Sequence, residues 1–88
     1  MNVRNHLIFG VHITERIRHV PTVQQLLSEY GCYIKTRLGL HEVDQNSCSP
    51  NGLLVLEMFG DEAKCQELFE KLNAVEGVEV KKIVFGHP

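Results

Sequence analysis

A histidine and a cysteine, His41 and Cys48, raise the question of a metal site. They stand in the stretch RLGLHEVDQNSC, which covers residues 37–48. Imidazole nitrogen and thiolate sulfur are good ligands for zinc and nickel. Such a site needs about four ligands, so the others would have to come from another subunit. The remaining candidates for this role are His6, His12 and His19.

The alternative for His41 and Cys48 is a strand end and a polar loop without a metal. The spacings most specific for metal binding, CxxC and HxH, do not occur in the sequence. Cys48 is the one thiol expected to be exposed, because Cys32 and Cys65 stand at apolar positions typical of core packing. On the sequence alone, both interpretations stay open.

Catalysis would need groups that the sequence does not provide in a recognisable pattern. A catalytic cysteine needs a base, and His41 can serve Cys48 only if the loop folds back. The chain has no glycine-rich phosphate loop, no GxSxG motif and no pair of carboxylates in an evident pocket. We therefore predict that the protein is not an enzyme, although small enzymes are built on similar folds.

Length and composition predict one small cytoplasmic domain over residues 1–88. The chain is 43% hydrophobic, which is enough for one modest core. Its net charge of -2 argues against direct binding of nucleic acid. No apolar run reaches the roughly 18 residues of a membrane span, and the N-terminus lacks a secretory pattern. The odd number of cysteines, three, favours reduced thiols.

Hydrophobic periodicity predicts six elements that position these residues. They alternate as strand, helix, strand, strand, helix and strand over 4–13, 20–30, 32–42, 53–59, 61–73 and 78–85. The stretch DQNSCSPNG, residues 44–52, is rich in turn formers and predicts a loop. The order βαββαβ is the ferredoxin-like arrangement. We therefore predict an α+β fold, with a four-stranded antiparallel sheet and two helices on one face.

Three residues are expected to mark the ends of the helices. Pro21 fits the first turn of the first helix, where a missing N–H costs little. Gly31 fits the position after that helix, where left-handed backbone is common. Asp61 can accept hydrogen bonds from the first N–H groups of the second helix.

The sheet face without helices is expected to be apolar. Period two places on it His6, Ile8, Gly10, His12, Tyr33, Lys35, Arg37, His41, Leu53, Val55, Glu57 and Phe59. Contiguous exposed apolar surface usually marks an interface, so we predict a homo-oligomer that associates through this face. Scattered apolar residues would need no such explanation. Glu57 needs a partner there, and Lys35, Arg37 and the histidines are available.

Three short segments carry a resemblance to a known family. They are the RLG of the second strand, the stretch NGLLVLEMFG and the closing GVEVKKIVF. In their βαββαβ order they are similar to the iron-only hydrogenase system regulator family, over about residues 4–85. That family is ACT-like, and its fold is shared with the C-terminal domain of nickel-responsive repressors. The resemblance implies a small cytoplasmic oligomer with a regulatory or ligand-sensing role.

The ACT-like resemblance also implies where a ligand would bind. ACT domains often bind an amino acid near the loop between the first strand and the first helix, with help from a glycine. Here that loop, TERIRHVPT, has no glycine, which argues against amino-acid binding of the usual kind. Arg16, Arg18 and His19 are still candidate contacts for an anionic effector, and Arg37 is a further one. The alternative is a solvated basic loop.

The resemblance to nickel-responsive repressors bears on the metal candidates. In those proteins the second strand ends with two histidines one residue apart, and a cysteine begins the third strand. His41 and Cys48 keep part of this pattern. Gly39 offers no ligand at the alternate position, and SPNG separates Cys48 from Leu53.

We therefore predict a non-enzymatic regulatory or ligand-sensing domain, of transcriptional or metabolic role, that acts as a homo-oligomer. One alternative is a nickel- or zinc-binding module that uses His41 and Cys48 across a subunit interface. Another is a structural subunit of a larger complex. Apart from such a metal, no cofactor is expected. The expected partners are further copies of the chain and a small-molecule effector, and neither nucleic acid nor a membrane.

Overall fold

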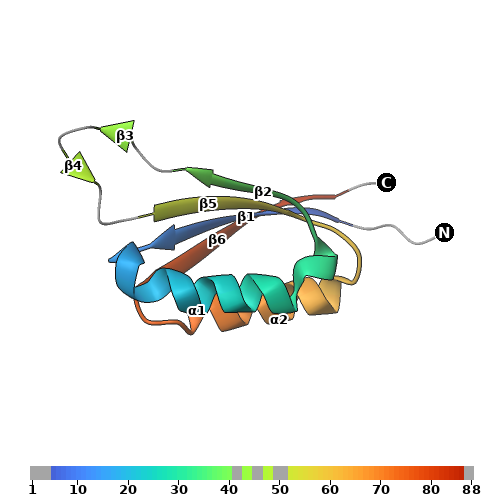
Figure 1. Ribbon diagram of the computed structural model, residues 1–88. Coiled ribbons are helices and arrows are strands. Elements are labelled where there is room, and N and C mark those ends of the chain that lie inside the picture. Colours follow the sequence, from blue (N-terminus) through green and yellow to red (C-terminus); the bar gives the residue numbers. More distant parts are fainter. Residues whose placement is uncertain (1–4, 41–42, 45–46, 49–51, 87–88) are drawn as a thin grey trace.

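The chain folds into two layers (Figure 1), and the structure, a computed structural model, describes residues 5–40, 43–44, 47–48 and 52–86. One layer is a four-stranded sheet, and the other consists of helices α1 (Arg16–Glu29) and α2 (Glu62–Asn73). The sheet has the order β2-β5-β1-β6, and its strands are β1 (His6–Ile13), β2 (Ile34–Leu40), β5 (Gly52–Met58) and β6 (Val78–Phe85). All neighbouring strands are antiparallel. This confirms the predicted ferredoxin-like fold.

The core lies between the helices and one face of the sheet. Every second residue of β1 from Phe9 to Ile13 is buried, and Leu56 and Met58 of β5 follow the same alternation. The residues of the helices that cover them are Val23, Leu27, Cys65, Leu68 and Leu72. These positions have the spacing of one helix face, so the periodicity that predicts the elements also predicts the core.

Cys65 is buried as predicted, but Cys32 is exposed. Cys32 lies in the 3₁₀ turn η1 (Gly31–Tyr33), which separates α1 from β2. The prediction for Cys32 assumed that β2 begins at residue 32. Gly31 was also predicted to be left-handed, whereas positive φ occurs among the described glycines at Gly60 and Gly77.

Helix α1 begins at Arg16 rather than at residue 20. The carbonyl of Glu15 accepts hydrogen bonds from the N–H groups of Arg18 and His19, at 2.9 and 3.3 Å. Residues 16–19 are therefore helix, and their prediction as a loop was wrong. Pro21 lies inside the helix and not in its first turn. Neither helix within the described residues is long and apolar enough to cross a membrane.

Asp61 caps α2 as predicted. One oxygen of its carboxylate accepts hydrogen bonds from the N–H groups of Ala63, at 2.8 Å, and Lys64, at 3.4 Å. These N–H groups have no partner inside the helix, so a side-chain oxygen at this position stabilises the helix end.

A short hairpin lies within the segment that was predicted as a loop. Strand β3 (Val43–Asp44) pairs antiparallel with β4 (Ser47–Cys48), and Val43 is opposite Cys48. The loop prediction for residues 44–52 was wrong for Asp44, Ser47 and Cys48, and also for Gly52, which begins β5. Strands of two residues are too short to produce a period-two pattern.

Strand β2 contains an irregularity that decides which of its side chains face the helices. Ile34 is opposite Met58 and Thr36 is opposite Glu57, so the register shifts between them. An extra residue in one strand reverses the alternation of all the side chains that follow. Arg37, opposite Leu56, consequently lies on the helix side, and Leu38, opposite Val55, faces away from the helices. Arg37 was predicted to lie on the face without helices, and that prediction was wrong.

Candidate functional site

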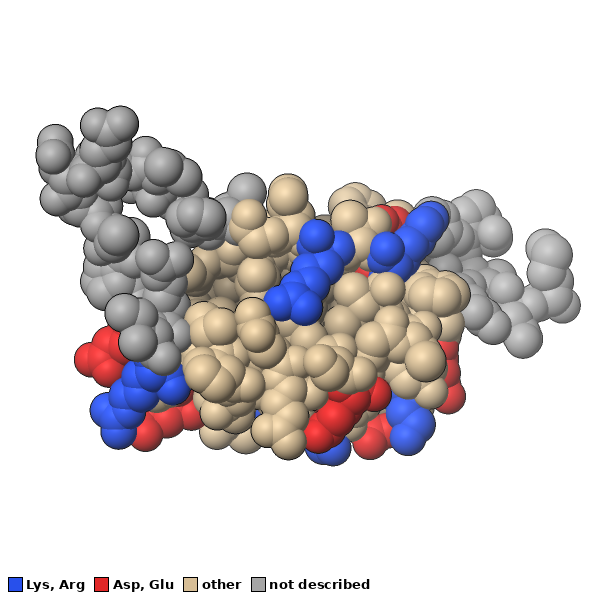
Figure 2. All heavy atoms as spheres, in the orientation of Figure 1, with Lys and Arg blue, Asp and Glu red and all other residues tan. Residues whose placement is uncertain are grey.

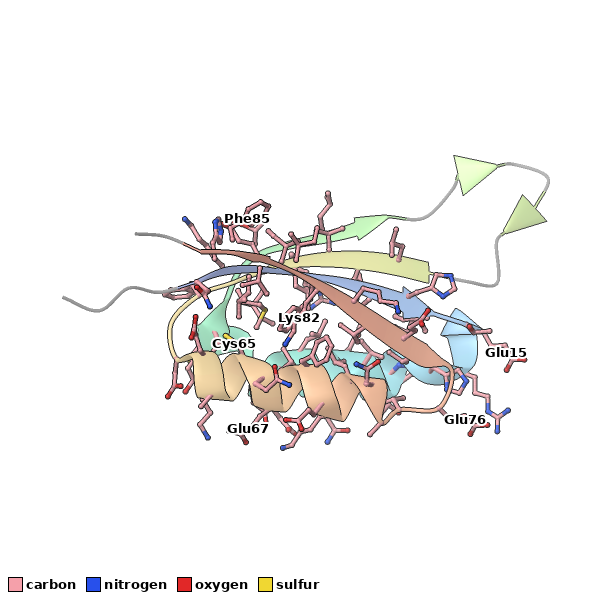
Figure 3. The ribbon with its side chains drawn as sticks, turned by 180° about the vertical axis from the view of Figure 1, so that it is seen from behind. Glu15, Cys65, Glu67, Glu76, Lys82 and Phe85 are labelled. Atoms are coloured by element: carbon pink, nitrogen blue, oxygen red, sulfur yellow. The ribbon has the colours of Figure 1, made fainter. Side chains whose placement is uncertain are left out.

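The sheet face opposite the helices, here called the open face, carries a group of exposed apolar side chains. Strand register places on it Ile8, His12, Leu38, Leu53, Val55, Ile83 and Phe85, with His6, Thr36, Glu57, Glu79 and Lys81 around them. Leu38, Ile83 and Phe85 are 52%, 55% and 51% exposed. Figure 3 shows Phe85 on this side of the sheet and Lys82 between β6 and α2. The apolar character predicted for this face is confirmed.

Three polar side chains form a hydrogen-bonded cluster on the open face. One carboxylate oxygen of Glu57 accepts a hydrogen bond from the Thr36 hydroxyl at 2.7 Å. The other lies 2.7 Å from His6 Nε2. Because a carboxylate only accepts, that ring nitrogen carries the hydrogen. The hydrogen bonds from Thr36 and His6, and the nearby charge of Lys35, hold the pKa of Glu57 below its usual value. A histidine partner for Glu57 was predicted, whereas Thr36 was not among the expected partners.

Replacing Glu57 by glutamine is expected to weaken the dependence of stability on acidic pH. The pKa of Glu57 is lower in the folded protein than its ordinary value of 4.5. Its contribution to stability is therefore present above about pH 4.5 and is lost as the pH falls through the folded-state pKa. Urea denaturation at a series of pH values measures this. Thr36→Val, which removes the strongest of the interactions, should reproduce part of the effect, and identical pH profiles for all three proteins would contradict the account.

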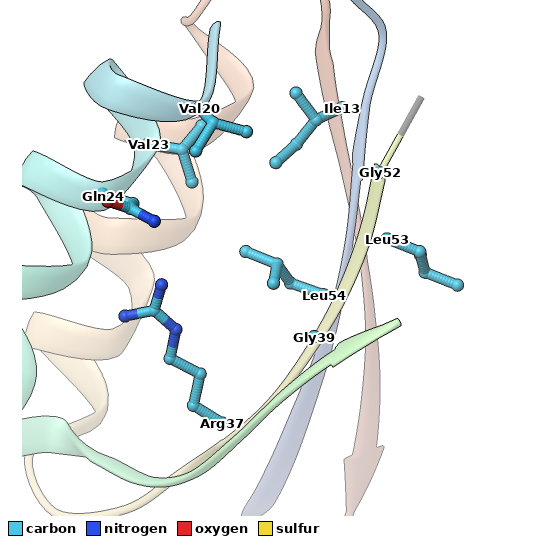
Figure 4. A pocket seen from close by; sticks show the side chains of 9 residues that line it. All are labelled: Ile13, Val20, Val23, Gln24, Arg37, Gly39, Gly52, Leu53 and Leu54. Atoms are coloured by element: carbon cyan, nitrogen blue, oxygen red, sulfur yellow. The ribbon is translucent and has the colours of Figure 1, made fainter. Parts of the chain in front are cut away.

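A cavity of about 110 Å³ lies between α1 and the sheet edge that β2 forms (Figure 4). It is lined by Ile13, Val20, Val23, Gln24, Arg37, Gly39, Gly52, Leu53 and Leu54. We call it the α1–β2 cavity. The side chains of Arg37 and Gln24 point toward each other across it, whereas Leu53 points to the other side of the sheet (Figure 4).

The four basic residues predicted to contact a ligand lie in different places. Arg37 lines the α1–β2 cavity. Arg18 is exposed in the first turn of α1, with its guanidinium 3.9 Å from the Glu15 carboxylate. His19 packs against Gly77, where an added Cβ would lie 2.7 Å from the imidazole ring. The side chain of Arg16 lies outside the described part of the structure. A joint role for these residues stays a prediction.

Two features of the α1–β2 cavity were not predicted from the sequence. They are its second polar residue, Gln24, and the glycines that leave the cavity unfilled. Gln24 was not among the predicted ligand contacts. Gly39 and Gly52 stand on neighbouring strands and have no side chains to fill the region next to Leu54. A glycine inside a strand often marks such room, and this was the signal available in the sequence.

The predicted metal ligands fall largely outside the described structure. His41 is not among the described residues, and only the backbone of Cys48, in β4, is described. The chain reverses between Val43 and Cys48, which lie opposite each other in the hairpin. Within the described ranges, no group of three or more metal-binding side chains occurs. The metal site stays a prediction.

Calorimetric titration of the reduced, metal-free protein with nickel and zinc tests the predicted metal site. The prediction is saturable submicromolar binding that His41→Ala/Cys48→Ala abolishes while the circular dichroism spectrum stays unchanged. Weak binding, or equal binding by the variant, would contradict it.

Comparison with models of protein families and with curated proteins finds no match. Solved structures do match. The uncharacterized protein TM1266 from Thermotoga maritima has a TM-score of 0.77 and 23% identity, covering 94% of this chain and 98% of its own. CPII, a nitrogen regulatory PII-like protein from Thiomonas intermedia K12 bound to ADP, AMP and bicarbonate, has a TM-score of 0.56, 16% identity and 99% coverage of both chains.

A third match comes from a much longer protein. A formyltetrahydrofolate deformylase from Pseudomonas putida KT2440 has a TM-score of 0.52 and 16% identity, over 89% of this chain but 28% of its own. At these identities the likeness concerns the fold. The chain thus shares its ferredoxin-like architecture with an uncharacterized protein, a PII-like regulatory protein and part of an enzyme.

Proposed function

We propose that this chain is a non-enzymatic regulatory domain that senses a small molecule and acts as a homo-oligomer in the cytoplasm. The open face carries this proposal. Its apolar residues come from all four strands and form one surface, with Leu38, Ile83 and Phe85 each about half exposed. Burial of apolar area contributes about 25 cal/mol per Å², so covering this surface with a second copy is favourable. Because these apolar residues cluster on one face of a two-layer domain, they are better explained as an interface than as isolated surface residues.

Two likenesses support the regulatory part of the proposal. The PII-like protein CPII has the same fold over nearly its whole length and is bound to small molecules. The motifs RLG, NGLLVLEMFG and GVEVKKIVF resemble the iron-only hydrogenase system regulators, so we extend the proposal to a transcriptional or metabolic role within that family. For the effector to regulate, it must bind the assembled and separate chains with different affinity.

Sedimentation velocity over a series of concentrations tests the proposal. The weight-average sedimentation coefficient is expected to rise from that of a monomer to that of a dimer or larger assembly as the concentration reaches high micromolar values. A monomer throughout this range would overturn it.

A further inference from the structure

We infer that the α1–β2 cavity is a binding site for a short aliphatic carboxylate. Its floor is apolar and its rim carries one cationic and one amide side chain. Ile13 and Val23 are 2% and 0% exposed, and Leu54 packs beside them. Such a surface is complementary to a hydrocarbon chain that ends in an anionic group.

Arg37 supplies the anchor for the anionic group. Among the described residues no carboxylate pairs with its guanidinium and no hydrogen bond engages it, whereas Lys64, Lys81 and Arg18 each have an acidic neighbour. A guanidinium matches the geometry of a carboxylate, with two parallel N–H donors. Gln24 points toward Arg37 from α1 and can donate a further hydrogen bond from its amide (Figure 4).

The size and polarity of the cavity select the class of ligand. The cavity is small, about 110 Å³, so it suits an acid with a short hydrocarbon chain. Among the described residues, the lining contains no carboxylate that could accept a hydrogen bond from the ammonium group of an amino acid. A wholly polar anion such as phosphate would leave the apolar floor without a partner. Figure 2 shows basic side chains near the middle of this side of the molecule, which favours an anionic ligand.

The cavity is joined to the open face through adjacent residues. Arg37 and Leu54 line the cavity, and their neighbours Leu38 and Leu53 lie on the open face. A ligand that fixes Arg37 therefore acts on β2 and β5 close to the proposed interface. This role in sensing rests on the proposed function, whereas binding itself does not.

Titration of the ¹⁵N-labelled protein with 3-methylbutanoate, followed by NMR, tests the inference. Saturable shifts are expected at the amides of α1, β2 and β5 that surround the cavity. The uncharged 3-methylbutanamide and the variant Arg37→Met, which keeps the apolar stem, should each bind about tenfold to a hundredfold more weakly. Gly39→Val should also weaken binding, because an added Cβ would already lie 3.4 Å from Leu54. Arg18→Met is the matched control and should bind like the unchanged chain.

Three results would overturn the inference. They are the absence of saturable shifts, equal binding by Arg37→Met, and shifts centred on the open face. The amide spectrum shows in each case whether the variant is folded. Sedimentation velocity distinguishes failure of the carboxylate site from failure of the proposed function. If the chain forms an oligomer but does not bind the acid, the site alone is refuted. A monomer that binds the acid refutes the oligomer and retains the site.

Discussion

Replacing Leu38 and Ile83 together by lysine is expected to leave the protein monomeric at concentrations where the unchanged chain associates. The two residues lie on β2 and β6, the two edge strands, and both side chains face away from the helices. They are 52% and 55% exposed in the single chain, so lysine is tolerated there without loss of core packing. In a symmetric dimer the change brings four like charges into an apolar interface. Like-charge contacts cost several kcal/mol, so we expect association to weaken by at least about a hundredfold.

The matched control adds the same charge to the helix layer. Gln25 and Ser28 are exposed on α1, and their replacement by lysine should leave the sedimentation coefficient at each concentration unchanged. If this control dissociates as much as Leu38→Lys/Ile83→Lys does, the cause is net charge and not the open face. If the open-face variant associates like the unchanged chain, the interface lies elsewhere.

Replacing Phe9 by alanine is expected to remove a large fraction of the stability of the domain. Phe9 is 0% exposed in the central strand β1, and its ring meets Phe69 of α2 edge to face at 5.5 Å. A buried phenylalanine replaced by alanine typically costs about 3–5 kcal/mol, because a cavity is left. Small domains have total stabilities of about 5–15 kcal/mol, so the loss is a large fraction. Urea denaturation followed by circular dichroism measures it.

Phe59 offers a control with the same chemistry. It follows β5 and is 53% exposed. Phe59→Ala is expected to change the free energy of unfolding by less than about 1 kcal/mol, as for most surface substitutions. Equal losses for the two variants would show that Phe9 does not lie in the core described above.

The fold was predictable where the pattern of burial is regular. β1 and β5 alternate without interruption, and α2 begins with Asp61 and keeps one apolar face, so their positions follow from periodicity. The start of α1 was missed because Pro21 suggested a first turn, whereas Glu15 in left-handed conformation begins the helix earlier.

The site was only partly predictable because it depends on the register of β2. A shift of one residue between Ile34 and Thr36 exchanges the faces of all later residues in the strand. Sequence periodicity does not reveal such a shift when both faces carry mixed side chains. Arg37 was therefore chosen for its charge but placed on the open face, and Thr36 was overlooked as a partner of Glu57.

Contacts between copies of the chain can be observed directly by isotope-filtered NMR. Protein labelled with ¹³C at its methyl groups is mixed with unlabelled protein at a concentration that favours association, and intermolecular NOEs are recorded. If the open face is the interface, the NOEs arise from the methyl groups of Ile8, Leu38 and Ile83. Intermolecular NOEs confined to the helix layer, or none in a sample that sediments as an oligomer, would contradict the open face as the surface of assembly.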